Sequence, residues 1–96
     1  MEVCKVVGQA VATAKDEGLR ATKLMIVRAT DHEGKVVGEP FAATDTVGAG
    51  ENELVLVARG SAARATRRTH DIPTDAAIVA ILDSLSLEGK VTYRKA

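Results

Sequence analysis

The stretch of this chain best suited to chemistry is DTVGAGENE, residues 45–53. Glycine-rich loops of this kind often bind phosphate, because their backbone N–H groups can approach an anion closely. A Walker loop, however, continues with Lys, then Ser or Thr, and then a helix. Here Glu51 and Glu53 follow the glycines, and a strand-like run comes next. Two carboxylates would repel phosphate, so the sequence predicts a tight turn with positive φ at Gly48 or Gly50.

A tight glycine turn also allows two backbones to approach each other closely. A symmetric subunit interface or a narrow axial opening requires such an approach, and Asn52 tolerates left-handed backbone geometry as well. We therefore expect Gly48, Ala49 and Gly50 to lie near a symmetry axis or a subunit contact.

A second candidate for chemistry is a basic run with no acid before residue 71. Its members are Arg59, Arg64, Arg67, Arg68 and His70. Small barrels can bind single-stranded nucleic acid on such a surface, but that binding depends on aromatic stacking. The chain has only two aromatic residues, Phe41 and Tyr93, and its formal net charge is zero. The sequence therefore favours an acidic protein edge or solvent over nucleic acid as the partner of this run.

Three other features do not add up to a catalytic or metal site. His32 lies in an acidic turn without a second histidine nearby, so we predict a solvated turn. Cys4 lies in a strand without a base partner, so we predict a small apolar side chain. Asp75 and Asp83 bracket an apolar strand that would separate them by about 25 Å, too far for shared acid–base work. We expect no catalytic residue, cofactor or metal.

The elements that must position these residues are short apolar runs separated by turn residues, a pattern typical of β structure. Six strands are expected, at residues 3–14, 23–30, 36–45, 53–60, 76–85 and 90–95. Two hairpin turns are expected, at DHEGK and LEGK. SAARATRR, residues 61–68, predicts one helix of about two turns with Ser61 as the N-cap. The prediction is a single all-β domain over residues 1–96, a small antiparallel barrel with one short helix.

Several of these strands are apolar on both faces, although a barrel has only one interior. The runs are LMIV at residues 24–27, LVLVA at 54–58 and AAIVAIL at 76–82. One two-turn helix is too small to cover the outer face of three strands. We therefore expect an obligate oligomer, most simply a ring in which strands pack against neighbouring subunits.

The compartment is predicted from what the chain contains. A single cysteine permits no internal disulfide, which suits a reducing cytosol. The first residues include Glu2 and Lys5 and lack the long apolar run of a signal peptide. No segment approaches the ~20 apolar residues of a membrane span. We expect a cytoplasmic protein without a membrane partner.

Three segments together resemble the EutN/CcmL family, the vertex proteins of bacterial microcompartment shells. They are DTVGAGENE, GSAAR at residues 60–64 and PTDAAIVAILD at residues 73–83. The similarity extends over nearly the whole chain. The sequence departs from the family pattern at Asn52, where a glycine is usual, and at Ala62, where a second serine is usual.

The resemblance implies an OB-like barrel that assembles into a pentameric ring with a narrow axial pore. Such rings occupy the corners of a shell otherwise tiled by hexameric shell proteins, and no catalysis or cofactor is implied. Arg64 is expected to reach the next subunit with its planar fork of donors; the alternative is a solvated charge. The candidate interface or pore residues are Gly48, Ala49, Gly50, Ser61, Arg64 and Asp75. The alternative function is an OB-like nucleic-acid-binding module that uses residues 59–68.

Overall fold

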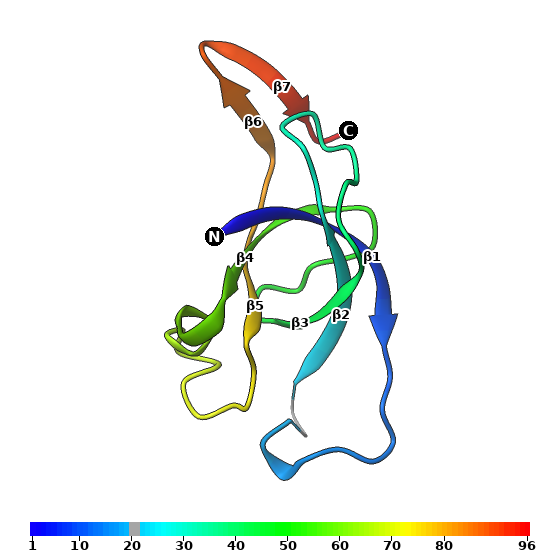
Figure 1. The fold of residues 1–96 in the computed structure, drawn as a ribbon, viewed down its shortest axis with the longest axis vertical. Helices are drawn as coiled ribbons and strands as arrows, with labels where there is room; N and C mark the ends of the chain where they lie inside the picture. Colours follow the sequence, from blue (N-terminus) through cyan, green and yellow to red (C-terminus); the bar gives the residue numbers. More distant parts are fainter. Residues whose placement is uncertain (20–21) are drawn as a thin grey trace.

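Five strands close into a barrel, and two further strands form a hairpin that projects from it (Figure 1). The computed structural model describes residues 1–19 and 22–96. The barrel strands are β1 (Glu2–Ala10), β2 (Lys23–Ala29), β3 (Phe41–Asp45), β4 (Leu54–Arg59) and β5 (Ala76–Ile81). The hairpin consists of β6 (Ser84–Leu87) and β7 (Lys90–Arg94), and two 3-10 helices are η1 (Glu17–Leu19) and η2 (Gly60–Arg64). The predicted all-β class is confirmed.

The barrel is mixed, whereas the sequence predicted an antiparallel one. Its strand order is β1-β2-β3-β5-β4. Four of the five seams are antiparallel, and β3 pairs with β5 in parallel through Thr44↔Ala77 and Asp45↔Ile78. The reason is arithmetic: strand directions cannot alternate all the way round a closed ring with an odd number of strands. At least one parallel seam is therefore required, and here it is short.

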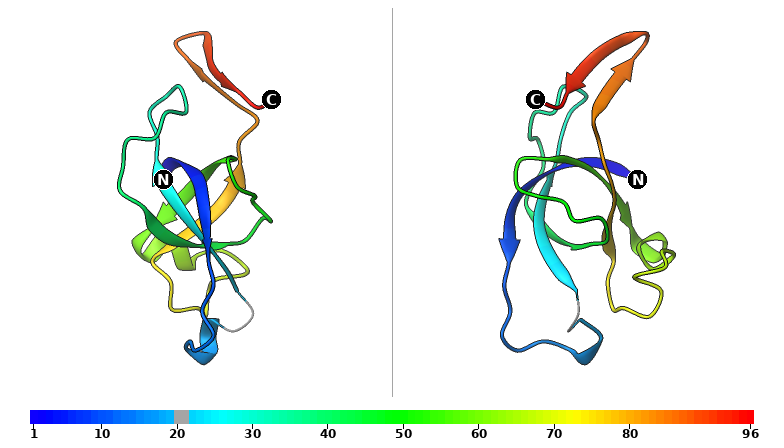
Figure 2. Two further views of the ribbon diagram at one scale, coloured as in Figure 1. Left: turned by 90° about the vertical axis from the view of Figure 1, so that its right-hand side faces the viewer. Right: turned by 180° about the vertical axis from the view of Figure 1, so that it is seen from behind.

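The long axis of the molecule runs through the barrel and the hairpin. The principal extents are 44 × 23 × 21 Å. Figure 2 shows β6 and β7 extending beyond one end of the barrel, while residues 11–19, which follow β1, extend beyond the other. Both predicted hairpin turns are present. The side chain of Asp31 accepts the N–H groups of Glu33 and Lys35, and Glu88 and Gly89 adopt positive φ between β6 and β7.

The predicted helix at residues 61–68 is wrong in type and length. The observed η2 ends at Arg64, and Ala65 closes it with a 3-10 hydrogen bond to the carbonyl of Ala62. Beyond it, the hydroxyl of Thr66 accepts the N–H groups of Arg68 and Thr69, which diverts the backbone from a helical path. Ser61 lies inside η2, because the N-cap position belongs to the preceding arginine.

The barrel interior is filled by small side chains. Its buried residues are Cys4, Val6, Met25, Val27, Ala43, Ala49, Val55, Val57, Ala76 and Ile78, and Phe41 packs against them from the edge. Inward and outward positions alternate along β1 and β2, as the strand period of two requires. The barrel therefore gains its stability from many Ala and Val contacts, as the composition predicted.

The outer face of the barrel is only partly covered by the protomer itself. Leu54 is 2% exposed, and Ala58 and Ala77 are buried where η2 packs against β4 and β5. In contrast, Leu24 and Ile26 on β2 remain partly exposed. Cover from another subunit is therefore not required for Leu54, Ala58 or Ala77, and the prediction of an oligomer depends on the outward residues that remain partly exposed.

Gly34 lies close to the Tyr93 ring of the hairpin and yields a first testable prediction. Its φ is +83°, and a Cβ atom there would lie 3.0 Å from Cδ1 of Tyr93 and 3.5 Å from Cδ2 of Leu54. Gly34→Ala should lower the free energy of unfolding by about 2–4 kcal/mol, from left-handed strain plus displacement of the Tyr93 ring. Gly89→Ala is the matched control, because its φ is +82° and nothing lies within 4 Å of the added Cβ. Urea unfolding should show a clearly smaller loss for the control, and equal losses would disprove the packing role of Gly34.

Candidate subunit interface

The backbone N–H groups of the glycine loop are occupied by the protein's own carboxylates. Oδ1 of Asp45 accepts the N–H groups of Val47 and Gly48 at 3.0 and 3.1 Å, and Oδ2 accepts that of Ala49 at 2.9 Å. The three successive amides form a concave donor set of the kind that binds anions. Asp45 already accepts all three N–H groups, so none of them is left to donate to a phosphate. The same three bonds hold the backbone in the predicted tight turn.

The second half of the loop is held by Glu53. Its Oε1 accepts the N–H of Gly50 at 2.6 Å, and its Oε2 pairs with Nζ of Lys95 at 2.6 Å. The Lys95 hydrogen bond, followed by the Gly50 N–H, holds the pKa of Glu53 below its usual value, and Glu53 in turn raises the pKa of Lys95. Sequence reasoning missed this contact, since Lys95 lies 42 residues from Glu53.

Positive φ occurs at Gly48 (78°) and at Asn52 (70°), as predicted, but not at Gly50. Ala49 is 1% exposed, and its methyl group packs in the barrel core. Any contact between the loop and another molecule must therefore use its exposed residues, among them Val47 and Gly48. The placement of Gly48, Ala49 and Gly50 near an axis stays a prediction.

The other three candidate residues lie together where η2 meets the start of β5. Ser61, Arg64 and Asp75 are all exposed. Nη1 of Arg64 donates to the carbonyl of Thr74 at 3.1 Å, which uses one of the five N–H donors of the guanidinium. The N–H of Gly60 donates to the backbone carbonyl of Asp75 at 2.8 Å, which fixes the two segments side by side.

Threonine side chains hold this region together, and no sequence pattern indicated this role. The hydroxyl of Thr44 donates to that of Thr74 at 2.9 Å, which in turn donates to the carbonyl of Ala76 at 2.9 Å. The hydroxyl of Thr69, which is fully buried, donates to the carbonyl of Ala63 at 2.6 Å. These bonds satisfy polar groups inside the 65–75 segment and make it a defined surface.

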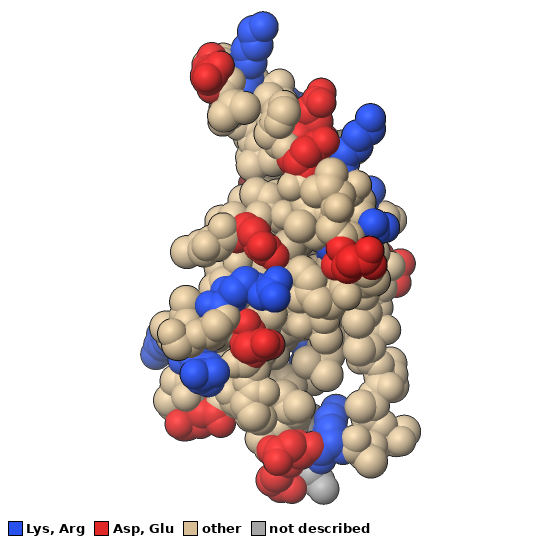
Figure 3. All heavy atoms as spheres, viewed as in Figure 1, with Lys and Arg blue, Asp and Glu red and all other residues tan. Residues whose placement is uncertain are grey.

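The basic run does not form a nucleic-acid platform. The guanidinium of Arg59 lies 4.1 Å from the centre of the Phe41 ring and pairs with Glu2 at 3.0 Å. Nε2 of His70 lies 2.9 Å from a carboxylate oxygen of Asp71. Figure 3 shows Lys and Arg side chains interspersed with acidic ones on the face it presents. Phe41 lies under Arg59 and Tyr93 lies beside Gly34, and both rings are only partly exposed, so the run lacks the open aromatic rings that base stacking uses.

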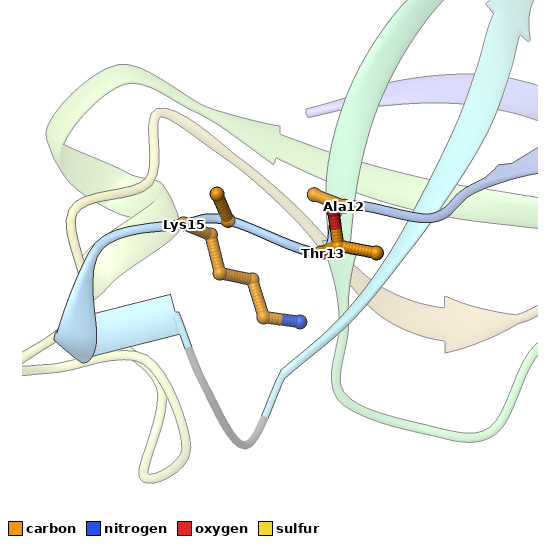
Figure 4. A pocket seen from close by; sticks show the side chains of 4 residues that line it. Ala12, Thr13 and Lys15 are labelled. Carbon is orange, nitrogen blue, oxygen red and sulfur yellow. The ribbon is translucent and has the colours of Figure 1, made fainter.

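Two surface pockets in the described part of the chain could be considered as sites for chemistry. The larger, of about 610 Å³, is lined by Ala12, Thr13, Ala14 and Lys15 in the connection after β1 (Figure 4). The smaller, of about 270 Å³, is lined by Thr22, Thr44, Asp45, Arg68 and Ile72. Among the described lining residues, the ionisable groups are Lys15 in the first pocket and Asp45 and Arg68 in the second. The Asp45 carboxylate is committed to the glycine loop, so these described residues do not assemble an acid–base pair.

His32 lies exposed in its turn, and no three His, Cys, Asp or Glu side chains within residues 1–19 and 22–96 are placed to hold a metal ion. In the same part of the chain, no helix is long and apolar enough to cross a membrane.

Cys4 behaves as a core residue with an inert thiol. Its Sγ lies 3.7 Å from Oε1 of Glu2, and burial, followed by the charge of Glu2, raises its pKa to about 12. The thiol of an unfolded chain ionises near pH 9.0. Between these values the unfolded state loses its proton first, so the free energy of unfolding should fall as pH rises from about 9 to 12.

Comparison with Cys4→Ala isolates this effect, because the variant lacks the ionisable group while other residues titrate as before. Urea unfolding between pH 8 and 12 should show a steeper decline for the wild type than for Cys4→Ala. Parallel declines would show that the thiol ionises equally in both states. Iodoacetamide at pH 8 should leave the native thiol unmodified.

Comparison with known proteins places these features in one family. The family model described as "Ethanolamine utilisation protein EutN/carboxysome" matches residues 1–83. The carboxysome shell vertex protein CcmL of Nostoc sp. is 43% identical over 96 residues, which cover 99% of this chain and 95% of that protein. The microcompartment shell vertex protein EutN of Salmonella typhimurium is 37% identical over 95 residues, 99% of this chain and 96% of its own length.

Solved structures agree with these sequence matches. The structure of Nostoc CcmL superposes with a TM-score of 0.93 and covers 99% of this chain and 100% of that one. The GrpN pentameric microcompartment shell protein of Rhodospirillum rubrum superposes with a TM-score of 0.79 at 38% identity, over 91% of this chain and 99% of that one. The chain therefore belongs to the EutN/CcmL family.

Proposed function

We propose that this chain is the vertex subunit of a bacterial microcompartment shell, in which five copies form a ring that closes a corner. The proposal depends chiefly on family membership, because the relatives compared above are named as shell vertex proteins and one as pentameric. The role is structural, not enzymatic. A flat hexagonal layer closes into a polyhedron only where fivefold rings interrupt it. The proposed partners of the ring are therefore hexameric shell proteins, and the shell lies in the cytoplasm.

The surface of the isolated protomer supports assembly. Its accessible area is 5999 Å² for 10.1 kDa, whereas a compact monomer of this mass exposes about 5,300 Å². Its radius of gyration is 13.4 Å, against about 12.5 Å for a compact domain of this length. Exposed apolar side chains occur on the hairpin at Leu87 and Val91, each about half exposed. A two-stranded hairpin is only marginally stable alone, so we infer that the ring covers this one.

Within the ring, we infer that Arg64 contacts Asp75 of the next subunit. Both side chains lie on one small patch, so a contact between copies of this patch is possible only near the axis, where all five copies converge. Positive and negative groups would then alternate around the opening, with Ser61 beside them. The exposed part of the glycine loop, including Gly48, forms a further subunit contact.

The first experiment is native mass spectrometry of the purified protein at micromolar concentration, followed by co-expression with hexameric shell proteins. Five copies, together with closed polyhedral particles seen by electron microscopy, are expected. A monomer would overturn the proposal. Rings that leave shells open at every corner would retain the assembly but refute the vertex role.

Nucleic-acid binding is the rival function, and it predicts a different outcome. Retention on single-stranded polynucleotide at physiological salt, lost on Arg67→Ala/Arg68→Ala substitution, would favour it. The engagement of both aromatic rings with protein partners argues against that result.

A further inference from the structure

We propose that Lys95 is a positioning residue that couples the C-terminal hairpin to the glycine loop through Glu53 and the Gly50 amide. The inference deepens the proposed function, because the loop is one of the surfaces assigned there to a subunit contact. It concerns a residue outside positions 1–83, the part matched by the family model.

The geometry forms a continuous chain of contacts. Nζ of Lys95 lies 2.6 Å from Oε2 of Glu53, and the other oxygen of that carboxylate accepts the Gly50 N–H at 2.6 Å. The Glu53 side chain is 22% exposed and that of Lys95 40%. Partial shielding from solvent strengthens a charge-assisted hydrogen bond relative to a fully solvated ion pair.

The end of the chain that carries Lys95 is itself fixed. Its backbone N–H donates to the carbonyl of Asp83 at 2.8 Å, so the residue closes the base of the hairpin. Two positions earlier, the Tyr93 ring packs against Gly34. A shift of the hairpin therefore moves the Lys95 amine, and the carboxylate that it holds moves with it.

The loop responds because its two halves are held differently. Asp45 fixes the first half from within the loop through three amides. In the second half, the Glu53 carboxylate accepts the Gly50 N–H, and the same carboxylate pairs with Lys95 at the base of the hairpin. The backbone bonds from Asn52 to Val6 and from Val6 to Glu53 then anchor the exit of the loop to β1. The rate of hydrogen exchange at the Gly50 amide should therefore report whether Lys95 holds the Glu53 carboxylate in place.

Amide hydrogen exchange of the assembled protein tests this coupling. Lys95→Met should speed exchange at Gly50 by about tenfold or more, while amides in β4 exchange as in the wild type. Lys95→Arg should restore most of the protection, since it keeps the charge. Lys90→Met is the matched control, because it removes the same charge from the same hairpin at an exposed position. Its Gly50 exchange should equal that of the wild type.

Unchanged exchange at Gly50 in Lys95→Met, or equal acceleration in Lys90→Met, would overturn the inference. Glu53→Gln provides a second route, and it should also accelerate Gly50 exchange while retaining side-chain volume. Native mass spectrometry of the same samples separates the two proposals. A wild-type protein that is not a pentamer would refute the ring, whereas the exchange comparison would still decide the coupling.

Discussion

Arg64→Glu and Asp75→Arg are each expected to dissociate the ring into monomers at micromolar concentration, and the double variant is expected to restore it. In the proposed contact between Arg64 and Asp75 of the next subunit, each single change places two like charges together. Removing one partner of a close interfacial charge pair costs about 2–5 kcal/mol, and the loss is repeated around the ring. The double variant reverses the polarity of each pair and leaves the attraction in place.

Protomer folding should survive these changes, because both side chains are exposed. Circular dichroism should confirm that the dissociated forms keep the barrel. Arg67→Glu is the control, since it introduces the same charge change three residues further on, at another exposed arginine. A ring that persists in Arg64→Glu, or a double variant no better than the singles, would refute the contact.

Asp45→Ala is expected to lower the free energy of unfolding by about 2–4 kcal/mol, because three loop amides lose their carboxylate acceptor. Added formate should recover part of this stability by entering the vacated donor set. At a concentration of ten times its Kd, formate would restore about 1.4 kcal/mol. Thermal unfolding in formate and in chloride at equal ionic strength measures the recovery.

Glu51→Ala supplies the control for Asp45→Ala, because it removes an exposed carboxylate from the same loop. This variant should be about as stable as the wild type and should gain nothing specific from formate. If the two variants lose equal stability, or if formate stabilises both alike, the loop does not contain an anion-binding donor set filled by Asp45.

Local patterns in the sequence predict much of this fold. The DHEGK and LEGK turns follow from their residue chemistry, and the glycine loop adopts positive φ at Gly48 because no side chain opposes it. The apolar runs predict the strands, although the predicted strand at 76–85 divides into β5 and β6. These features depend on neighbouring residues only, which is why sequence reasoning reaches them.

Features that join distant segments were not predictable in this way. The parallel seam of β3 with β5 follows from the number of strands in the closed barrel, and that number is not visible in any one strand. In the sequence, Thr66 lies in a run of good helix formers. In the structure, its hydroxyl accepts the N–H groups of Arg68 and Thr69, which ends the helical path. Likewise, Lys95 resembles a solvated terminal charge, and only the closed barrel brings Glu53 to it.

The closing contacts of the barrel also determine the order of events during synthesis. β1 pairs with β4 through Glu2↔Val57, and the bond from Arg59 to Glu2 spans 57 residues. The first strand therefore has an unpaired edge until more than half of the chain has been made, and the hairpin follows later still. Contacts between residues so far apart in sequence slow folding and favour completion late in translation. A nascent subunit consequently has no closed barrel to offer a neighbour until β4 and β5 have been made.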